Sequence, residues 1–369
     1  MKKLLCLILL LPLFITTVNA QENNNYYTYY NDSGLSSLEG LLPQEVANTL
    51  NELGIDLASY SSILNLNTNS VLNTIKSYFK NGLKTPLTSF LLSVCTLIMC
   101  AIISGAWGQK LQINENYTYV CMLSLLTVVL LPFVNSITTL ISATKSLSVF
   151  MLAFIPIFAG VLVMSGSVTL SSVYSGLMLV VSNSISSALS FIVTPVITIY
   201  ISLGVSTVLS GIDGAHLLTM RIKTAINWAL GFIATLFSAL LSIQTVIAKS
   251  ADNLMVKTTK FVIGSTVPIA GGALGEALTT VTASMGILRA AAMSWCVIVI
   301  ALLILPPLIE LIIWRISLCT LSSVAHFLSL PDAAKLLDVC SSAAGLVFAV
   351  VLTVSVIFII SLAILGGVS

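Results

Sequence analysis

The chain has 369 residues, and only 8% of them are charged, about a third of the share found in ordinary soluble proteins. Hydrophobic residues make up 57% of the sequence, so we interpret it as an all-α polytopic membrane protein that sits in a lipid bilayer. The net charge of +2 excludes a protein that binds nucleic acid through a large basic face.

The first 20 residues have the pattern of a secretory signal peptide. Lys2 and Lys3 precede an apolar run from Leu4 to Ile15, which is too short to cross a bilayer, and small residues lead up to Ala20. We predict cleavage after Ala20, so the mature chain begins outside the cytoplasm. An uncleaved membrane anchor is the alternative, but the polar residues from Asn19 onward argue against it.

Residues 21–70 are polar and acidic, and we interpret them as an extracytoplasmic leader. Their Asn- and Tyr-rich start, from Asn23 to Tyr30, predicts a disordered tether. Farther along, the sequence predicts a short helix with Pro43 near its start and Gly54 near its end.

Residues 71–85 predict an amphipathic helix on the membrane surface. Leu72, Ile75 and Phe79 share one helical face. Lysines at positions 76, 80 and 84 repeat every four residues beside it. A helix solvated on all sides is the alternative.

Residues 86–369 form the predicted membrane domain, with seven or eight transmembrane helices. A crossing needs about 20 apolar residues. Six segments meet this criterion clearly: Leu87–Trp107, Val120–Ile137, Leu147–Met164, Ile226–Ala248, Cys296–Trp314 and Ala343–Leu365. The stretch Val168–Ile212 is long enough for two more crossings separated near Thr194-Pro195, and Phe261–Ile287 affects the total.

The distribution of positive charge gives a partly conflicting topology. A start outside the cytoplasm leaves Arg221 and Lys223 inside, as the positive-inside rule prefers. The same path leaves Lys249, Lys257 and Lys260 outside. We infer that these three lysines serve a purpose other than topology.

An internal repeat is indicated by residues that recur at a constant spacing of 112 positions. The matched residues are Lys145, Pro156, Gly160 and Pro195 in the first unit and Lys257, Pro268, Gly272 and Pro307 in the second. The predicted units are residues 145–210 and 257–322, each with helices broken by proline. Matched broken helices mark binding sites in many transporters. Coincidence, or simple proline kinks, would explain the same pattern.

The segment Asp252–Arg289 contains the most informative mixture of residues. Lys257 and Lys260 share a helical face, and Glu276 lies in an otherwise apolar stretch, where an ionisable group suggests function. The candidates for pore-lining or docking groups are Lys257, Lys260, Glu276, Asp252 and Arg289. The candidates for helix breaks and close helix packing are Pro156, Gly160, Pro195, Pro268, Gly271, Gly272, Gly275 and Pro307. Alternatively, the segment is a solvated re-entrant loop with Glu276 at its surface.

Glu310 is a second acidic candidate, but we favour a role as the end of a span. Trp314 and Arg315 follow it and are typical of an anchor at the membrane interface.

The sequence predicts neither an enzyme nor a cofactor. It has only two histidines, 216 and 326, and no metal-ligand spacing or phosphate-binding loop. The cysteines lie mostly within or beside predicted spans, so we interpret them as small apolar residues rather than as disulfide partners.

Several motifs are similar to those of the stage III sporulation protein AE family of endospore-forming bacteria. They are Leu42-Pro43-Gln44-Glu45-Val46, Gly54-Ile55, Lys260-Phe261, Val267-Pro268 and Gly271-Gly272-Ala273-Leu274-Gly275-Glu276. The short leader and its Asn/Tyr tract depart from the family pattern.

This resemblance implies a subunit of the channel-like complex that joins the mother cell to the forespore and supports late forespore gene expression. The chain would then lie in the mother-cell membrane, facing the forespore. Its partners would be other stage III sporulation membrane proteins and a protein on the forespore side, and its glycine pairs also allow a homo-oligomer. A self-contained secondary transporter of a small solute is the alternative, and a membrane scaffold without a pore is a third.

Overall fold

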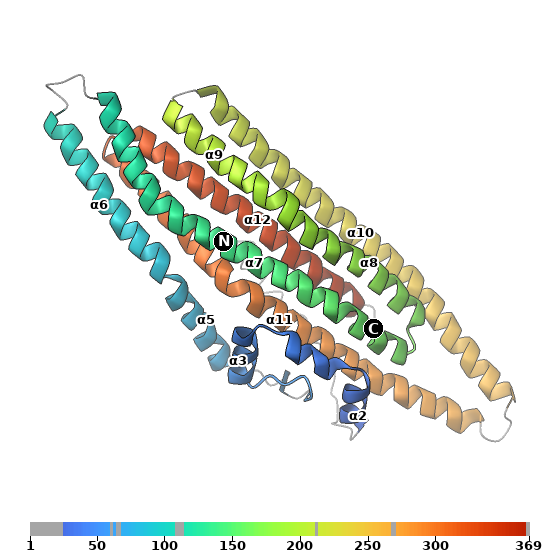
Figure 1. Ribbon diagram of the computed structural model, residues 1–369. Helices are drawn as coiled ribbons and strands as arrows, with labels where there is room; N and C mark the ends of the chain where they lie inside the picture. Colours follow the sequence, from blue (N-terminus) through green and yellow to red (C-terminus); the bar gives the residue numbers. More distant parts are fainter. Residues whose placement is uncertain are drawn as a thin grey trace.

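Long helices lie side by side in the computed structural model, which describes residues 25–59, 62–63, 68–107, 114–210, 213–266 and 271–366 (Figure 1). The predicted signal peptide therefore lies outside the described residues. The elements in chain order are α2 (Asn25–Asp32), the 3-10 helix η2 (Leu35–Leu41), α3 (Gln44–Leu53), α5 (Thr68–Gly82), α6 (Lys84–Trp107), α7 (Asn114–Met164), α8 (Val168–Ala188), the π-helical turn η3 (Leu189–Val193), α9 (Thr194–Ser210), α10 (Asp213–Thr266), α11 (Gly271–Phe327) and α12 (Pro331–Gly366).

Six helical stretches within the described residues are long and apolar enough to cross a membrane, which agrees with the predicted class of all-α polytopic membrane protein. The number differs from the seven or eight crossings that we expected. Val120–Ile137 and Leu147–Met164, predicted as two spans, both belong to α7, which continues through Pro132 and Pro156. A proline removes one backbone hydrogen bond and does not have to end a helix whose flanking turns are packed.

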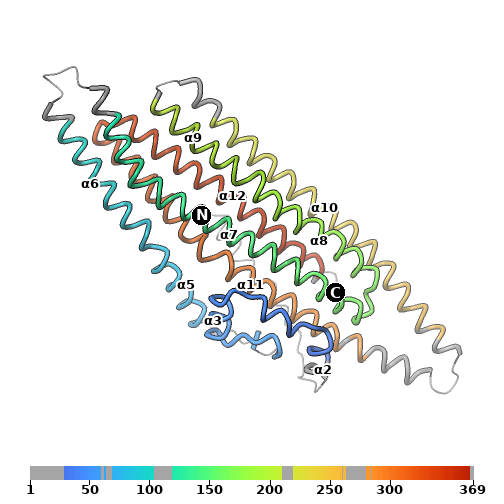
Figure 2. The backbone as a smooth tube through the Cα atoms, viewed as in Figure 1, coloured from blue at the N-terminus to red at the C-terminus, as the bar shows by residue number. Residues whose placement is uncertain are grey.

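The reversal expected near Thr194-Pro195 is also absent. Here α8, η3 and α9 form one continuous rod (Figure 2). Pro195 has no N–H to donate, and the wider π-helical turn just before it takes up the mismatch. Thr194 Oγ1 donates a hydrogen bond to the carbonyl of Leu189 at 2.8 Å. The proline therefore shifts the helical register without turning the chain back.

The centre of the array is formed by α11 and α12, and its edges by α10 and α6. In the most apolar window of α11, 61% of the residues are buried inside the molecule, against 17% in that of α10. Packing of aromatic rings connects α7, α8 and α11, with Phe154, Phe158, Tyr174 and Trp295 all fully buried. The two edge helices consequently present long apolar faces that no other described part of the chain covers.

The leader folds into a small structure against the array. Leu35, Leu38 and Leu50 are buried beneath α2, η2 and α3, which pack on α7 and α11. The predicted short helix is confirmed as α3, between Pro43 and Gly54. Gly54 ends this helix with a φ of 68°, a left-handed conformation that favours glycine. The tether prediction is wrong from Asn25 onward, because α2 is helical and Tyr30 packs into the same core.

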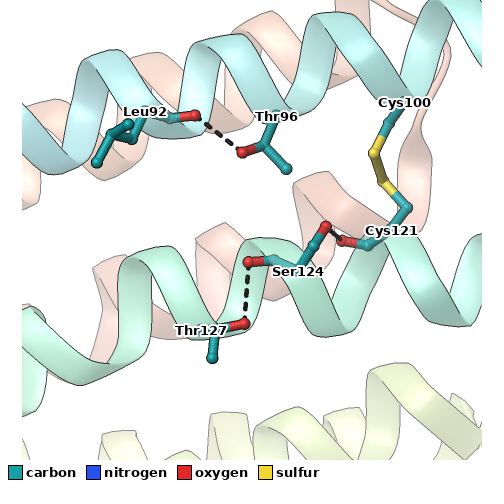
Figure 3. Close-up of a disulfide and its surroundings, with 6 residues drawn as sticks. All are labelled: Leu92, Thr96, Cys100, Cys121, Ser124 and Thr127. Atoms are coloured by element: carbon teal, nitrogen blue, oxygen red, sulfur yellow. Dashed lines mark hydrogen bonds between the residues drawn. A yellow bond between two sulfur atoms is a disulfide. The ribbon is translucent and has the colours of Figure 1, made fainter.

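A disulfide joins α6 to α7 near the connection between them. Cys100 and Cys121 have Cα atoms 6.0 Å apart, and Figure 3 shows the bond between the two helices. This corrects our interpretation of all the cysteines as unpaired apolar residues. The two residues are 21 positions apart in the sequence, and only the antiparallel packing of the helices brings them together.

Candidate functional site

Asp252 is a buried residue that caps a neighbouring helix. Its side chain extends from α10 to the start of α8 and is 4% exposed. One carboxylate oxygen accepts the N–H of Thr169 at 2.8 Å, and the other accepts the N–H of Leu170 at 2.9 Å. The first N–H groups of a helix lack partners within the helix and carry partial positive charge. Asp252 therefore ties α10 to the turn between α7 and α8, and its two oxygens are occupied by this contact.

Arg289 performs the complementary role at a helix C-terminus. Its guanidinium, partly buried on α11, donates a hydrogen bond to the carbonyl of Leu365 in the last turn of α12. The free carbonyls at a helix C-terminus carry partial negative charge, which a cation stabilises. Arg289 thus anchors the end of α12, and it does not form a pair with Asp252.

Lys257 lies apart from these two residues, exposed on the outer face of α10. The side chains of Lys260 and Glu276 are outside the described residues, as is Pro268. Gly271, Gly272 and Gly275 belong to the first turns of α11, and their surroundings are not described either. The candidates for pore-lining or docking whose side chains are described are Asp252, Lys257 and Arg289, and these three do not line a common pore or cavity.

The predicted helix-break residues do not interrupt helices in the expected way. Pro156 lies inside α7 and Pro307 inside α11, and both helices continue past them. The prediction that Gly160 permits close helix packing is not supported, because a Cβ atom there would have no neighbour within 4 Å. The close approach is at Gly204 on α9, where a Cβ atom would overlap the side chain of Val339 on α12.

The repeat of 112 residues has no structural counterpart at the one proline pair that the structure describes. The other pair cannot be compared in this way, since Pro156 lies within α7 but Pro268 is outside the described residues. Pro195 begins α9, whereas Pro307 is in the interior of α11. The matched broken helices on which the transporter alternative depended are therefore not present in the described helices.

A different group of polar side chains lies where the leader meets the array. Ser136 on α7 donates a hydrogen bond to the Oε1 atom of Glu310 on α11. The indole Nε1 of Trp314 donates in turn to Ser136 Oγ at 2.9 Å. Trp314 and Ser136 are both buried. The two hydrogen bonds form a chain that runs from the Trp314 indole through the Ser136 hydroxyl to the Glu310 carboxylate at the edge of the apolar core. Arg315 points elsewhere and packs against Gly345 of α12.

Glu310 borders a pocket of about 640 Å³, which we call the leader pocket. Pro306 and Pro307 lie in its wall and cannot donate to the carbonyls of Leu302 and Leu303, so these oxygens lose their usual helical partners. The remaining lining residues are Pro43, Glu45, Val46, Asn48 and Thr49 of the leader, Tyr78, Asn81 and Gly82 of α5, and Thr139, Ser142, Ala143 and Ser146 of α7.

The leader pocket is held closed on one side by direct contacts. Tyr78 donates its hydroxyl to Thr49 Oγ1 at 3.2 Å and so links α5 to α3. Gly82 lies against α11, since a Cβ atom there would be 3.5 Å from the Cα of Glu310. The arrangement presents oxygen acceptors to a cationic or hydrogen-bond-donating group. The described residues contain no group of three or more His, Cys, Asp or Glu side chains that could hold a metal ion.

Sequence reasoning undervalued Glu310 because its partner is far away in the chain. Ser136 is 174 positions from Glu310 and 178 from Trp314. The available signal was local: Glu310 and Trp314 are four residues apart and so share a helical face. Only the packing of α7 against α11 adds the serine that connects them.

The array and its folded leader define a class of protein, a helical multi-pass membrane protein with a small acidic unit bound to one half of its length. A profile of the stage III sporulation protein AE family matches residues 57–369. The chain therefore belongs to the stage III sporulation protein AE family. It is 24% identical over 357 residues to the stage III sporulation protein AE of Bacillus subtilis (strain 168), which covers 95% of this chain and 86% of that relative. No solved structure is detectably similar to the chain.

Proposed function

We propose that this chain is a non-enzymatic subunit of the channel-like complex that joins the mother cell to the forespore. In this proposal it lies in the mother-cell membrane with its leader on the forespore side, together with other stage III sporulation membrane proteins and a forespore-side partner. Membership of the family supports the role in sporulation. The six apolar helices support a multi-pass membrane protein.

The position of the leader indicates which half of the array is in the bilayer. Leader residues line pockets with α7 from Thr139 to Ser146 and with α11 from Trp295 to Glu310. The leader's acidic side chains are exposed at that level, and ionised carboxylates are not stable in hydrocarbon. The hydrocarbon core therefore surrounds the opposite half of the helices.

The lengths of the helices agree with this placement. Helix α6 has 24 residues and is about 36 Å long, close to the hydrocarbon thickness of about 30 Å. The exposed lysines 76, 80 and 84 then lie at the membrane boundary, where cationic side chains are stabilised by lipid headgroups. On the leader side, the other half of the array projects beyond the bilayer. It contains parts of α7, α8, α10 and α11, together with Asp252, Lys257 and Arg289.

The observation that carries the proposal is the length of this projecting, apolar half. Helix α10 has 54 residues and is about 81 Å long, more than twice the thickness of the hydrocarbon core. An apolar surface of this size outside lipid needs a protein partner. We propose that Lys257, Lys260 and Glu276 are docking groups on the projecting half, as expected of a subunit in a larger assembly.

Two measurements test the proposal. A tagged, full-length chain is purified from sporulating cells after engulfment, and we expect other stage III sporulation membrane proteins in fixed stoichiometry with it. A chain recovered alone would overturn the proposed function. For topology, cysteines replace Ser36 in the leader and Lys335 near the start of α12, both of them exposed. A membrane-impermeant maleimide should label S36C in intact cells and K335C only after permeabilisation; the reverse pattern would refute the placement.

A further inference from the structure

The outer face of α10 exposes apolar side chains over a greater length than lipid can cover. They extend from Met220, 55% exposed, to Phe261, 76% exposed. At a rise of 1.5 Å per residue this distance is about 60 Å. A bilayer core of about 30 Å covers about 39 Å of a helix that is tilted by 40°, the upper end of the usual range. At least about 20 Å of this face therefore needs another covering.

The uncovered part of α10 is the end near the leader side of the array. Asp252 holds this end against the turn that follows α7, and the leader packs on the same half of α7. Leu254 and Met255 are 67% and 59% exposed there, and Lys257 is exposed beside them. Asp252, the single acid between residues 249 and 262, is buried. We call this surface, formed by Leu254, Met255, Lys257 and Phe261, the α10 edge; it is apolar and basic.

The leader has the opposite charge. Between residues 25 and 59 the chain has no lysine or arginine. Its five acids are all exposed, and they are Asp32, Glu39, Glu45, Glu52 and Asp56. Leu41 is also 53% exposed, so this surface too has an apolar component. The leader packs on α5, α7 and α11, whereas α10 packs mainly on α8, α9 and α12, so the two surfaces lie on different sides of the array within one chain (Figure 1).

We propose that the α10 edge of one copy binds the acidic leader of a second copy of this chain. The two surfaces are opposite in charge, lie on the same half of the array and face different sides of it. Burial of the exposed apolar side chains supplies affinity, and the complementary charges fix the partner and the register. A contact between two different surfaces repeats from copy to copy, so it builds a ring where the rotation closes.

This inference uses the membrane placement of the proposed function, but it does not require any other sporulation protein. The test therefore uses the purified full-length chain in lipid nanodiscs and in detergent. A photo-crosslinking amino acid replaces Leu254 on the α10 edge and, as a matched control, Leu131, which is 66% exposed on the membrane half of α7. Mixing ¹⁵N-labelled with unlabelled chains separates crosslinks between copies from crosslinks within one copy.

We expect crosslinks from position 254 to residues 25–59 of a different copy, and crosslinks from position 131 only to lipid. Lys257→Glu should weaken the association about tenfold in low salt, and Asp32→Lys or Glu52→Lys in the same chain should restore it. Lys335→Glu, an exposed charge reversal at the other end of the array, should have no effect.

A monomeric chain at all concentrations would overturn the inference, as would crosslinks from position 254 only to its own chain or only to lipid. Association that is unaffected by Lys257→Glu would also refute it. If copies associate as predicted but no other sporulation protein co-purifies from cells, the inference stands and the proposed function fails. If other sporulation proteins co-purify but copies of the chain do not associate, the proposed function stands and the inference fails.

Discussion

Replacing Asp252 by alanine should destabilise the protein substantially, because it removes both acceptors from the start of α8. The two hydrogen bonds, 2.8 and 2.9 Å long, are made by a charged group, and such bonds contribute about 1.5–3 kcal/mol each. Part of this contribution survives in the variant, since the freed N–H of Thr169 is half-buried and can reach water. We therefore expect a loss of about 3 kcal/mol for Asp252→Ala.

The amide variant separates charge from shape. In Asp252→Asn the side-chain oxygen can still accept one N–H, but its NH₂ group faces the second N–H, and two donors cannot bond. The charge that stabilises the helix N-terminus is also lost. We expect about 2 kcal/mol for this variant, between alanine and the native residue.

Thermal unfolding of the detergent-solubilised chain, followed by tryptophan fluorescence, measures the difference. A loss of 3 kcal/mol lowers the Tm by about 6–10 °C in a domain of a few hundred residues. Asn253→Ala, an exposed neighbour on the same helix, is the control and should change the stability by less than about 0.5 kcal/mol. If Asp252→Ala melts together with Asn253→Ala, Asp252 does not anchor α10 to α8, and the reasoning is wrong.

Three further outcomes are expected. Ser136→Ala should cost about 2 kcal/mol and change the fluorescence of Trp314, whose indole N–H loses its buried acceptor; an unchanged spectrum would contradict the hydrogen-bond chain. Gly204→Ala should cost about 1–3 kcal/mol through overlap with Val339, and Val339→Ala in the same chain should recover most of this loss, whereas equal melting of single and double variants would not fit. Burial and the nearby carboxylate of Glu39 raise the pKa of Tyr30, so the unfolded leader loses this proton first; proteolysis of the leader should increase above about pH 10 in the native chain but not in Tyr30→Phe.

The leader pocket and the α10 edge lie on the same half of the molecule and suggest a division of roles. Contacts around the leader pocket, between α3, α5 and α11, hold the leader on the array of its own chain. The α10 edge is then free to meet a different leader. In the proposed association, each copy therefore supplies both an acidic surface and a basic one.

The composition was sufficient to determine the class of the protein. With so few charges, long apolar segments have no stable place except as helices in lipid or against other apolar helices, and both outcomes are found here. The limits of α3 were equally readable, because Pro43 and Gly54 act on the backbone locally. Motifs in the leader and around residues 260–276 indicated the family, and the family profile confirms it.

Tertiary structure decided which of the sparse charges have partners. In the sequence, the segment from Asp252 to Arg289 resembles one site, but the fold separates its two ends. Asp252 accepts hydrogen bonds from the start of α8, and Arg289 donates one to the end of α12. Ser136 and Glu310 meet although 174 positions lie between them. Local patterns report the periodicity of a helix, whereas the ends and neighbours of helices longer than the bilayer depend on how the whole array packs. The sequence therefore determined that this is a sporulation membrane protein built of helices, and only the fold decided which helices lie at the centre of the array and which charges they bring to a partner.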